Sequence, residues 1–177
     1  MACIQEETQS SAVERQPSSC PDLAYDMETV RRKSAEARFN IISTFSGGGG
    51  SSIGYRLAGG RVLGANEFVS EAARTYKANF PDTHLDMGDI RAILSTPNTL
   101  EEYLSLAGTA PGELDLLDGS PPCCQFSSVG SDISDQDVMR SYSDTRQKHI
   151  ATLSHDWAQF ALKVNSKTVV MENVPEK

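Results

Sequence analysis

A cysteine preceded by two prolines is the residue of this sequence whose surroundings best suit chemistry. Cys123 follows Pro121 and Pro122, which come after an apolar segment, residues 114–118, that predicts a buried strand. The prolines restrict the backbone on the approach to the sulfur. A cysteine on such a turn can present its thiol to a ligand at the carboxyl edge of a sheet. A cysteine alone is more often an ordinary thiol, so the other signals in the chain decide its interpretation.

A run of four glycines, residues 47–50, lies between a predicted strand at 39–45 and a predicted helix at 51–58. Glycine lets the backbone come close to a ligand, and the start of the helix supplies free N–H groups. Neither the dinucleotide pattern GxGxxG nor the phosphate loop GxxxxGK[ST] fits this segment. This mismatch counts against the alternative of a nicotinamide-dependent oxidoreductase.

Acidic and aromatic residues follow the next two predicted strands, at 61–67 and 84–87. Glu67 stands 20 residues after Gly47, where a carboxylate can accept hydrogen bonds from ribose hydroxyls. Phe68 could stack on a base, and Asp89 could accept a hydrogen bond from an adenine amino group. Each acid alone would be an ordinary cap or turn residue. Together they indicate an adenosine-type ligand without a bound phosphate, and S-adenosylmethionine is the leading candidate.

The elements that position these residues alternate between strand and helix. Further helices are predicted at 70–79, 99–106 and 146–164, and a last strand at 167–172, so we expect an α/β fold with a mostly parallel sheet. Residues 1–38 are rich in Gln, Glu, Ser and Pro and predict a disordered leader that includes a short helix within 27–38. Residues 119 to about 144 predict a long polar loop, and loops of that length are usually functional or disordered.

The composition limits the function classes. A chain of 177 residues corresponds to one domain. Its net charge of −8 argues against this polypeptide binding nucleic acid on its own. There is no apolar run long enough to span a membrane and no secretory signal. The four cysteines contain no CxxC pair, which argues against a zinc site and favours reduced thiols in a cytoplasmic protein.

Five segments in this order resemble the motifs of the cytosine-C5 DNA methyltransferases. They are residues 45–54 (FSGGGGSSIG), 74–81 (RTYKANFP), 88–90 (GDI), 119–127 (GSPPCCQFS) and 171–175 (MENVP). The resemblance covers residues 39–177. It implies a Rossmann-like methyltransferase fold that is incomplete on its carboxyl-terminal side, so that residues 39–177 would be a partial catalytic domain.

The resemblance also implies roles for single residues. Those that would hold S-adenosylmethionine are Phe45, Ser46, Gly47, Gly49, Glu67, Phe68, Asp89, Ile90 and Pro121. Those that would bind the substrate are Pro122, Ser127, Asn173 and Val174. Cys123 would attack C6 of a cytosine flipped out of the DNA duplex, and Glu172 would contact N3 and the exocyclic amine. Cys124 occupies a position where the family often has Gln.

The family's catalytic domain continues beyond the Glu-Asn-Val motif, into a target-recognition region that this sequence lacks. We therefore expect a fragment, or one subunit of a split enzyme, that is inactive until a carboxyl-terminal part is supplied. The apolar last strand agrees, because an exposed edge of this kind invites pairing with further chain. Two alternatives stay open: a non-catalytic S-adenosylmethionine-binding or regulatory relative, and a tRNA cytosine-C5 methyltransferase. Restriction–modification is one of several possible biological roles.

Overall fold

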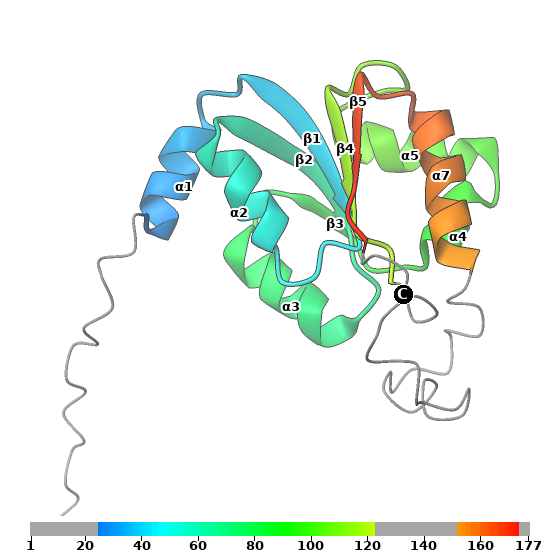
Figure 1. Cartoon of the computed structure of the whole chain (residues 1–177), viewed down its shortest axis with the longest axis horizontal. Coiled ribbons are helices and arrows are strands. Elements are labelled where there is room, and N and C mark those ends of the chain that lie inside the picture. The colour runs from blue at the N-terminus through cyan, green and yellow to red at the C-terminus, as the bar shows by residue number, and fades with distance from the viewer. Residues whose placement is uncertain (1–24, 123–151, 174–177) are drawn as a thin grey trace, which may run out of the picture.

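A parallel sheet between two layers of helices forms the centre of the molecule (Figure 1). The computed structural model describes residues 25–122 and 152–173. In these ranges the strand order is β3-β2-β1-β4-β5, and all neighbouring strands are parallel. The strands are β1 (Phe39–Thr44), β2 (Gly60–Asn66), β3 (His84–Asp86), β4 (Leu116–Gly119) and β5 (Thr168–Met171). The expected Rossmann-like α/β fold is therefore confirmed.

The strand order changes direction between β1 and β4, although all the strands are parallel. From β1 the chain runs outward through β2 to β3 and then crosses to β4 on the other side of β1. In open parallel sheets, ligands bind beyond the carboxyl ends of the strands at such a reversal. The segments after β1, β2, β3 and β4 all meet at this edge, and they are the segments in which the sequence places its candidate residues.

Helices cover both faces of the sheet (Figure 1). On one face lie α1 (Met27–Ser34), α2 (Gly50–Leu57) and α3 (Ser70–Asn79), and on the other lie α4 (Ile90–Leu94), α5 (Pro97–Leu106) and α7 (Leu153–Val164). Of these, α4 was not predicted. It forms because Asp89 caps it, accepting a hydrogen bond from the backbone of Arg91.

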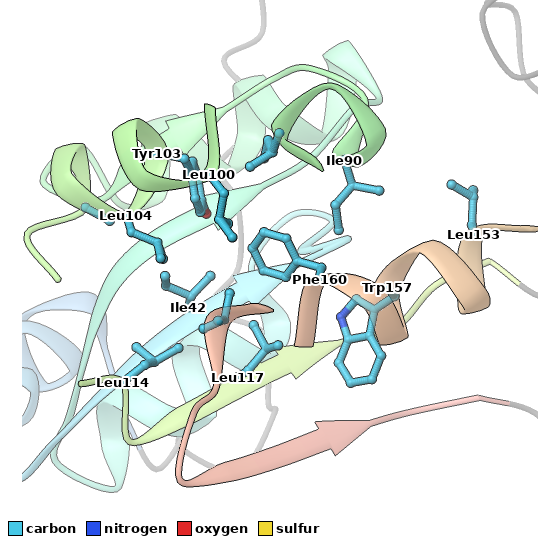
Figure 2. Packing of buried hydrophobic residues seen from close by; sticks show 13 residues of the cluster. Ile42, Ile90, Leu100, Tyr103, Leu104, Leu114, Leu117, Leu153, Trp157 and Phe160 are labelled. Atoms are coloured by element: carbon cyan, nitrogen blue, oxygen red, sulfur yellow. The ribbon is translucent and has the colours of Figure 1, made fainter. Parts of the chain in front are cut away.

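The larger part of the core lies between the sheet and α4, α5 and α7 (Figure 2). The apolar stripe predicted for the last helix is buried where the structure describes it, at Leu153, Trp157, Phe160 and Val164. Trp157 also donates a hydrogen bond from its indole nitrogen to Thr44 Oγ1, at 2.7 Å. This bond satisfies a polar group that would otherwise be costly to bury, and it ties α7 to the end of β1.

A smaller core lies on the opposite face, around Val30, Ala65, Tyr76 and Phe80. Val30 comes from α1 and is fully buried. The short helix expected within the leader is thus present and packs on α2, so the packed unit begins before Phe39. Residues 1–24 lie outside the described residues, as do the long loop from 123 and the predicted helical residues 146–151.

Strand β5 is an exposed sheet edge in the part of the chain that the structure describes. It pairs with β4, and each of its residues is exposed. Val169, Val170 and Met171 are 46%, 38% and 49% exposed. The apolar edge expected from the sequence is therefore present. No described helix has the length and apolar character needed to cross a lipid bilayer.

Candidate active site

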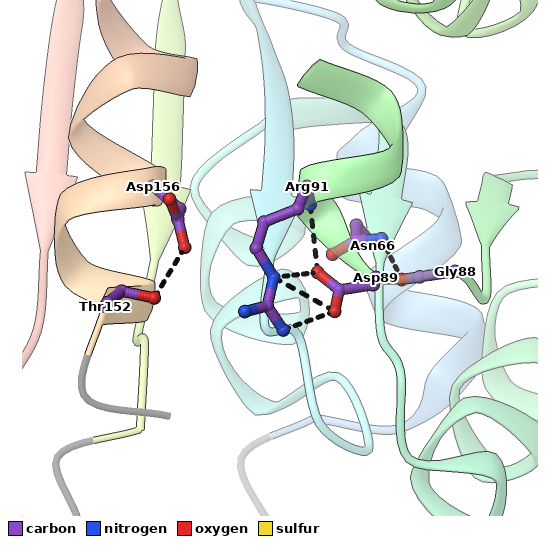
Figure 3. Close-up of polar contacts among 6 residues, drawn as sticks. All are labelled: Asn66, Gly88, Asp89, Arg91, Thr152 and Asp156. Atoms are coloured by element: carbon purple, nitrogen blue, oxygen red, sulfur yellow. Dashed lines mark hydrogen bonds and ion pairs between the residues drawn. The ribbon is translucent and has the colours of Figure 1, made fainter. Parts of the chain in front are cut away.

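Backbone hydrogen bonds join the carboxyl ends of the first three strands. The amide of Ser46 donates to the carbonyl of Asn66 at 3.2 Å, and the amide of Glu67 donates to the carbonyl of Asp86 at 3.0 Å. The side chain of Asn66 then donates to Asp86 Oδ1 at 2.9 Å. It also donates to the carbonyl of Gly88 at 2.9 Å (Figure 3). Asn66 is almost fully buried. It therefore holds the turn after β3 in place, a role that sequence analysis missed.

The glycine loop between β1 and α2 has an unusual backbone. Gly47 and Gly49 have positive φ angles of 55° and 98°, and Phe45 has a φ of 51°. A positive φ is costly for a bulky residue, and residues in that conformation cluster at functional sites. At Gly49 a Cβ would also collide with the ring of Phe80. The conformation of the loop thus explains why glycine stands at position 49.

Glu67 is the residue that joins this loop to the end of β2. Its Oε2 accepts a hydrogen bond from the amide of Gly47 and its Oε1 accepts one from the amide of Val69, each at 2.7 Å. Glu67 is only 7% exposed. A carboxylate has about four lone-pair directions, so two acceptor positions remain in addition to those that the amides use. The side chain is rigidly held and can still accept hydrogen bonds from the hydroxyls of a ligand.

Asp89 is paired with Arg91 in this structure (Figure 3). Its Oδ1 accepts from the backbone amide and from Nε of Arg91, both at 2.9 Å. Burial by itself would raise the pKa of Asp89, but the hydrogen bonds and charge of Arg91 outweigh it and hold the pKa below its usual value. From the sequence, the carboxylate of Asp89 was expected to accept a hydrogen bond from an adenine amino group. Arg91 already uses some of the lone pairs of this carboxylate. Arg91 was not predicted; the only signal in the sequence was its position two residues after Asp89.

A cavity of about 170 Å³ lies at these strand ends, and we call it the strand-end cavity. Five residues expected to hold the cofactor line it: Phe45, Glu67, Phe68, Asp89 and Ile90. Pro122, expected at the substrate, lines it as well. The lining residues that sequence analysis missed are Asn66, Val69, Arg91, Ser120 and Leu153. The lining does not include Ser46, Gly47, Gly49 or Pro121. Gly47 instead donates a backbone hydrogen bond to Glu67, which lines the cavity.

A buried carboxylate at the end of β4 is a second feature that the sequence did not reveal. Asp118 is 6% exposed and accepts hydrogen bonds from Ser43 Oγ and the hydroxyl of Tyr55, each at 3.0 Å. Burial raises the pKa of Asp118, and the charge of Glu172 adds to this effect although the two hydrogen bonds oppose it. Burial, with the charge of Asp118, raises the pKa of Tyr55 to about 12.

Glu172 follows β5 and is exposed. Its amide donates to the carbonyl of Gly119 at 3.0 Å, which extends the pairing of β4 and β5 by one residue. This bond brings Glu172 to the same edge of the sheet as the residues after β4. Asn173 is half-buried. Three of the expected residues, Cys123, Ser127 and Val174, lie outside the described residues.

The arrangement suits a neutral or cationic adenosine-type ligand better than a metal ion. Glu67 offers acceptors for hydroxyl groups, and Phe45, Phe68 and Ile90 offer apolar and aromatic surface around the same cavity. Among the residues that the structure describes, no group of three or more His, Cys, Asp or Glu side chains could hold a metal. These residues fit the adenosine part of S-adenosylmethionine.

Comparisons with known proteins all match the chain to the same family. Residues 39–176 match the family model described as C-5 cytosine-specific DNA methylase. The chain is 34% identical over 134 residues to the type II methyltransferase M.NgoPII of Neisseria gonorrhoeae, covering 76% of this chain and 33% of that protein. It is 30% identical over 153 residues to the type II methyltransferase M.Sau96I of Staphylococcus aureus, covering 86% and 30%.

A solved structure agrees with these matches. The protein is described as a DNA modification methyltransferase encoded within a prophage of Escherichia coli, and it superposes on this chain with a TM-score of 0.57. The two sequences are 26% identical, and the match covers 77% of this chain and 32% of the other. The chain thus spans about a third of the length of each of these three relatives.

Proposed function

Because the chain belongs to the family of C-5 cytosine-specific DNA methylases, we propose that it forms the amino-terminal part of the catalytic domain of a DNA (cytosine-5-)-methyltransferase. In this proposal residues 39–177, with α1 packed against them, continue into a target-recognition region carried by further chain or by a partner subunit. The observation that carries the proposal is the strand-end cavity, in which Phe45, Glu67 and Phe68 meet Pro122, the residue before Cys123. Its substrate would be DNA, and we expect the protein in the cytoplasm, associated with the nucleoid if the host is bacterial.

S-adenosylmethionine, when bound in the strand-end cavity, would supply an electrophilic methyl group. Glu67 would accept hydrogen bonds from the ribose hydroxyls, with its orientation fixed by the amides of Gly47 and Val69. Phe68 and Ile90 would flank the base. Asp89 would accept a hydrogen bond from the adenine amino group with the carboxylate lone pairs that Arg91 does not use.

Cys123 and Glu172 would act on the cytosine. The thiolate of Cys123 would add to C6, and the electron pair of the C5–C6 double bond would make C5 nucleophilic. A protonated Glu172 at N3 would offset the negative charge that develops on the ring. Once C5 carries the methyl group, loss of the C5 proton and departure of the thiolate restore the aromatic ring. Pro122, Ser127, Asn173 and Val174 would contact the flipped base.

Cofactor binding can be tested on the chain as it stands. We expect S-adenosylmethionine to bind in calorimetric titration, and Glu67→Gln to weaken binding roughly tenfold to a hundredfold, because a charged hydrogen-bond acceptor contributes about 1.5–3 kcal/mol. Glu71→Gln is the matched control, since Glu71 is exposed and contacts Ser70 and Arg74 on α3. Equal loss in both variants, or tighter binding of a nicotinamide cofactor, would contradict the proposal.

In this proposal the covalent step would also require the carboxyl-terminal part that carries target recognition. We expect no methyl transfer by the 177-residue chain alone, and transfer to DNA once that part is added from a relative or supplied as a continuation. With DNA that carries fluorine at C5 of the target cytosine, the C5 proton is absent and the adduct should persist on a denaturing gel. Cys123→Ser should abolish the adduct and Cys124→Ser should retain it. Retention in Cys123→Ser would disprove the assignment of the nucleophile.

A further inference from the structure

A second cavity lies near the start of β2, away from the carboxyl end of that strand. It has a volume of about 410 Å³ and is lined by residues of α1, the end of α2, the start of β2 and the segment before β3. We call it the arginine cavity, after Arg31, Arg56 and Arg61 in its lining. The two cavities share no lining residue: Arg61 and Val62 at the start of β2 line the arginine cavity, whereas Asn66 at the end of β2 lines the strand-end cavity. The arginine cavity is therefore separate from the site proposed above.

The charge of this lining is positive in a chain whose net charge is −8. Of the described residues that line the cavity, three are arginines and one, Asp82, is an acid. Arg31 and Arg61 are exposed, and neither forms an ion pair with any residue that the structure describes. The nearby carboxylate of Glu36 is already paired with Lys33 at 2.9 Å. Two guanidinium groups at the cavity are thus available to a ligand.

Arg56 is the buried member of the group. It is 7% exposed, its Nη2 donates to Thr83 Oγ1 at 2.6 Å, and its guanidinium carbon lies 4.7 Å from the centre of the Phe80 ring. Its Nε is buried without a hydrogen-bond partner. Burial lowers the pKa of Arg56, and the charges of Arg31 and Arg61 add to this effect while Tyr76 and Asp82 oppose it. A buried cation without a paired anion is costly, so an anion in the cavity would offset this cost.

We propose that the arginine cavity binds a phosphate group. Arginine presents several N–H donors in a planar fork that matches the oxygens of phosphate, and it outperforms other side chains in this role. The cavity has room, since a water molecule occupies about 30 Å³ in the liquid and a phosphate group is only a few times larger. The phosphate comes either as the free ion or on a small organic ester, and the two sources share the chemistry that these arginines recognise.

The test is the thermal unfolding of the 177-residue chain in increasing inorganic phosphate, with chloride adjusted to keep the ionic strength constant. A ligand that binds the folded state raises the unfolding temperature as its concentration rises. We expect a dissociation constant on the order of 1 mM, weakened at least about tenfold in the double variant Arg31→Gln/Arg61→Gln. The matched control, Arg32→Gln/Arg74→Gln, removes the same charge from exposed positions outside the cavity and should respond like the wild type.

Further readouts separate binding from a structural role of the arginines. In the absence of phosphate, Arg31→Gln/Arg61→Gln should unfold at a temperature no lower than the wild type, because it loses no ion pair with any residue in the described ranges. Tighter binding of glycerol 3-phosphate than of inorganic phosphate would support an organic ester, and equal binding would support the free ion. No phosphate-dependent shift in the wild type, or equal shifts in both double variants, would overturn the proposal.

Discussion

Two aspartates only three residues apart, Asp115 and Asp118, have opposite electrostatic environments. Asp118 is buried, and burial raises its pKa above the ordinary value of 3.8. Asp115 lies just before β4, where Lys167 at 2.7 Å and the amide of Asn40 at 2.8 Å lower its pKa below 3.8. The same residue type therefore affects the pH dependence of folding in opposite directions at these two positions.

Asp118→Asn and Asp115→Asn should change the pH dependence of stability with opposite sign. A raised native pKa gives stability that is present below 3.8 and lost as the pH rises through the native value. A lowered native pKa gives stability that is present above 3.8 and lost as the pH falls through the native value. Relative to Asp118→Asn, the wild type should lose stability as the pH rises from below 3.8 toward neutral.

Relative to Asp115→Asn, the wild type should instead lose stability as the pH falls below 3.8. Urea unfolding of the three proteins across this range measures both effects. The two variants act as controls for one another, because each replaces a carboxylate by an amide of the same shape. Parallel pH profiles for the two variants would show that the environments described above do not govern these carboxylates.

At the scale of elements, the start of α2 depends on one backbone conformation. Gly49 is the residue before the helix, its amide donates to the carbonyl of Ser46 at 3.0 Å, and its own carbonyl accepts from the amide of Ile53 at 3.0 Å. Its φ of 98° is accessible to glycine and strained for other residues. The turn that presents Gly47 to Glu67 and the first turn of the helix therefore share this residue.

Gly49→Ala should destabilise the protein by more than about 1–2 kcal/mol, the cost of a left-handed conformation alone, because the new methyl group also collides with Phe80. Gly50→Ala is the matched control. A methyl group added at position 50 would have no other atom within 4 Å, and the φ there is not positive, so this change should be neutral or stabilising by up to about 1 kcal/mol. Chemical unfolding of both variants measures the difference, and equal stability would refute this account of the loop.

At the scale of the whole molecule, the described part of the sheet ends at an exposed apolar strand. The chain spans about a third of the length of the relatives described above. In the function proposed above, β5 would be the edge that further chain or a partner meets. Exposed edges with apolar side chains promote association between copies. The isolated chain should consequently self-associate through β5 when nothing else covers it.

Val169→Lys should reduce this self-association, because a charged side chain on an edge strand opposes pairing. Sedimentation velocity over a range of protein concentrations measures the effect. Leu106→Lys is the control, since Leu106 is 63% exposed and lies at the end of helix α5 rather than on a strand. A similar reduction in both variants would mean that general hydrophobic contact, rather than strand pairing, drives association.

The alternation of strands and helices could be predicted from the sequence, and with it the residues that stand at strand ends. Glu67, Phe68 and Asp89 could be found because a parallel sheet brings the carboxyl ends of its strands to one edge. The glycine loop was recognisable from its composition, and the buried stripe of α7 from its helical spacing. These features depend on residues close together in the chain, so local patterns suffice to predict them.

The pairing of distant side chains could be known only from the folded molecule. The sequence did not indicate that Asn66 would hold the turn at Gly88, or that Asp118 would accept hydrogen bonds from Ser43 and Tyr55. The arginine cavity likewise joins residues from four separate segments. Such contacts depend on how helices pack across the sheet, where the side-chain partners are chosen by space and burial rather than by neighbours in the sequence.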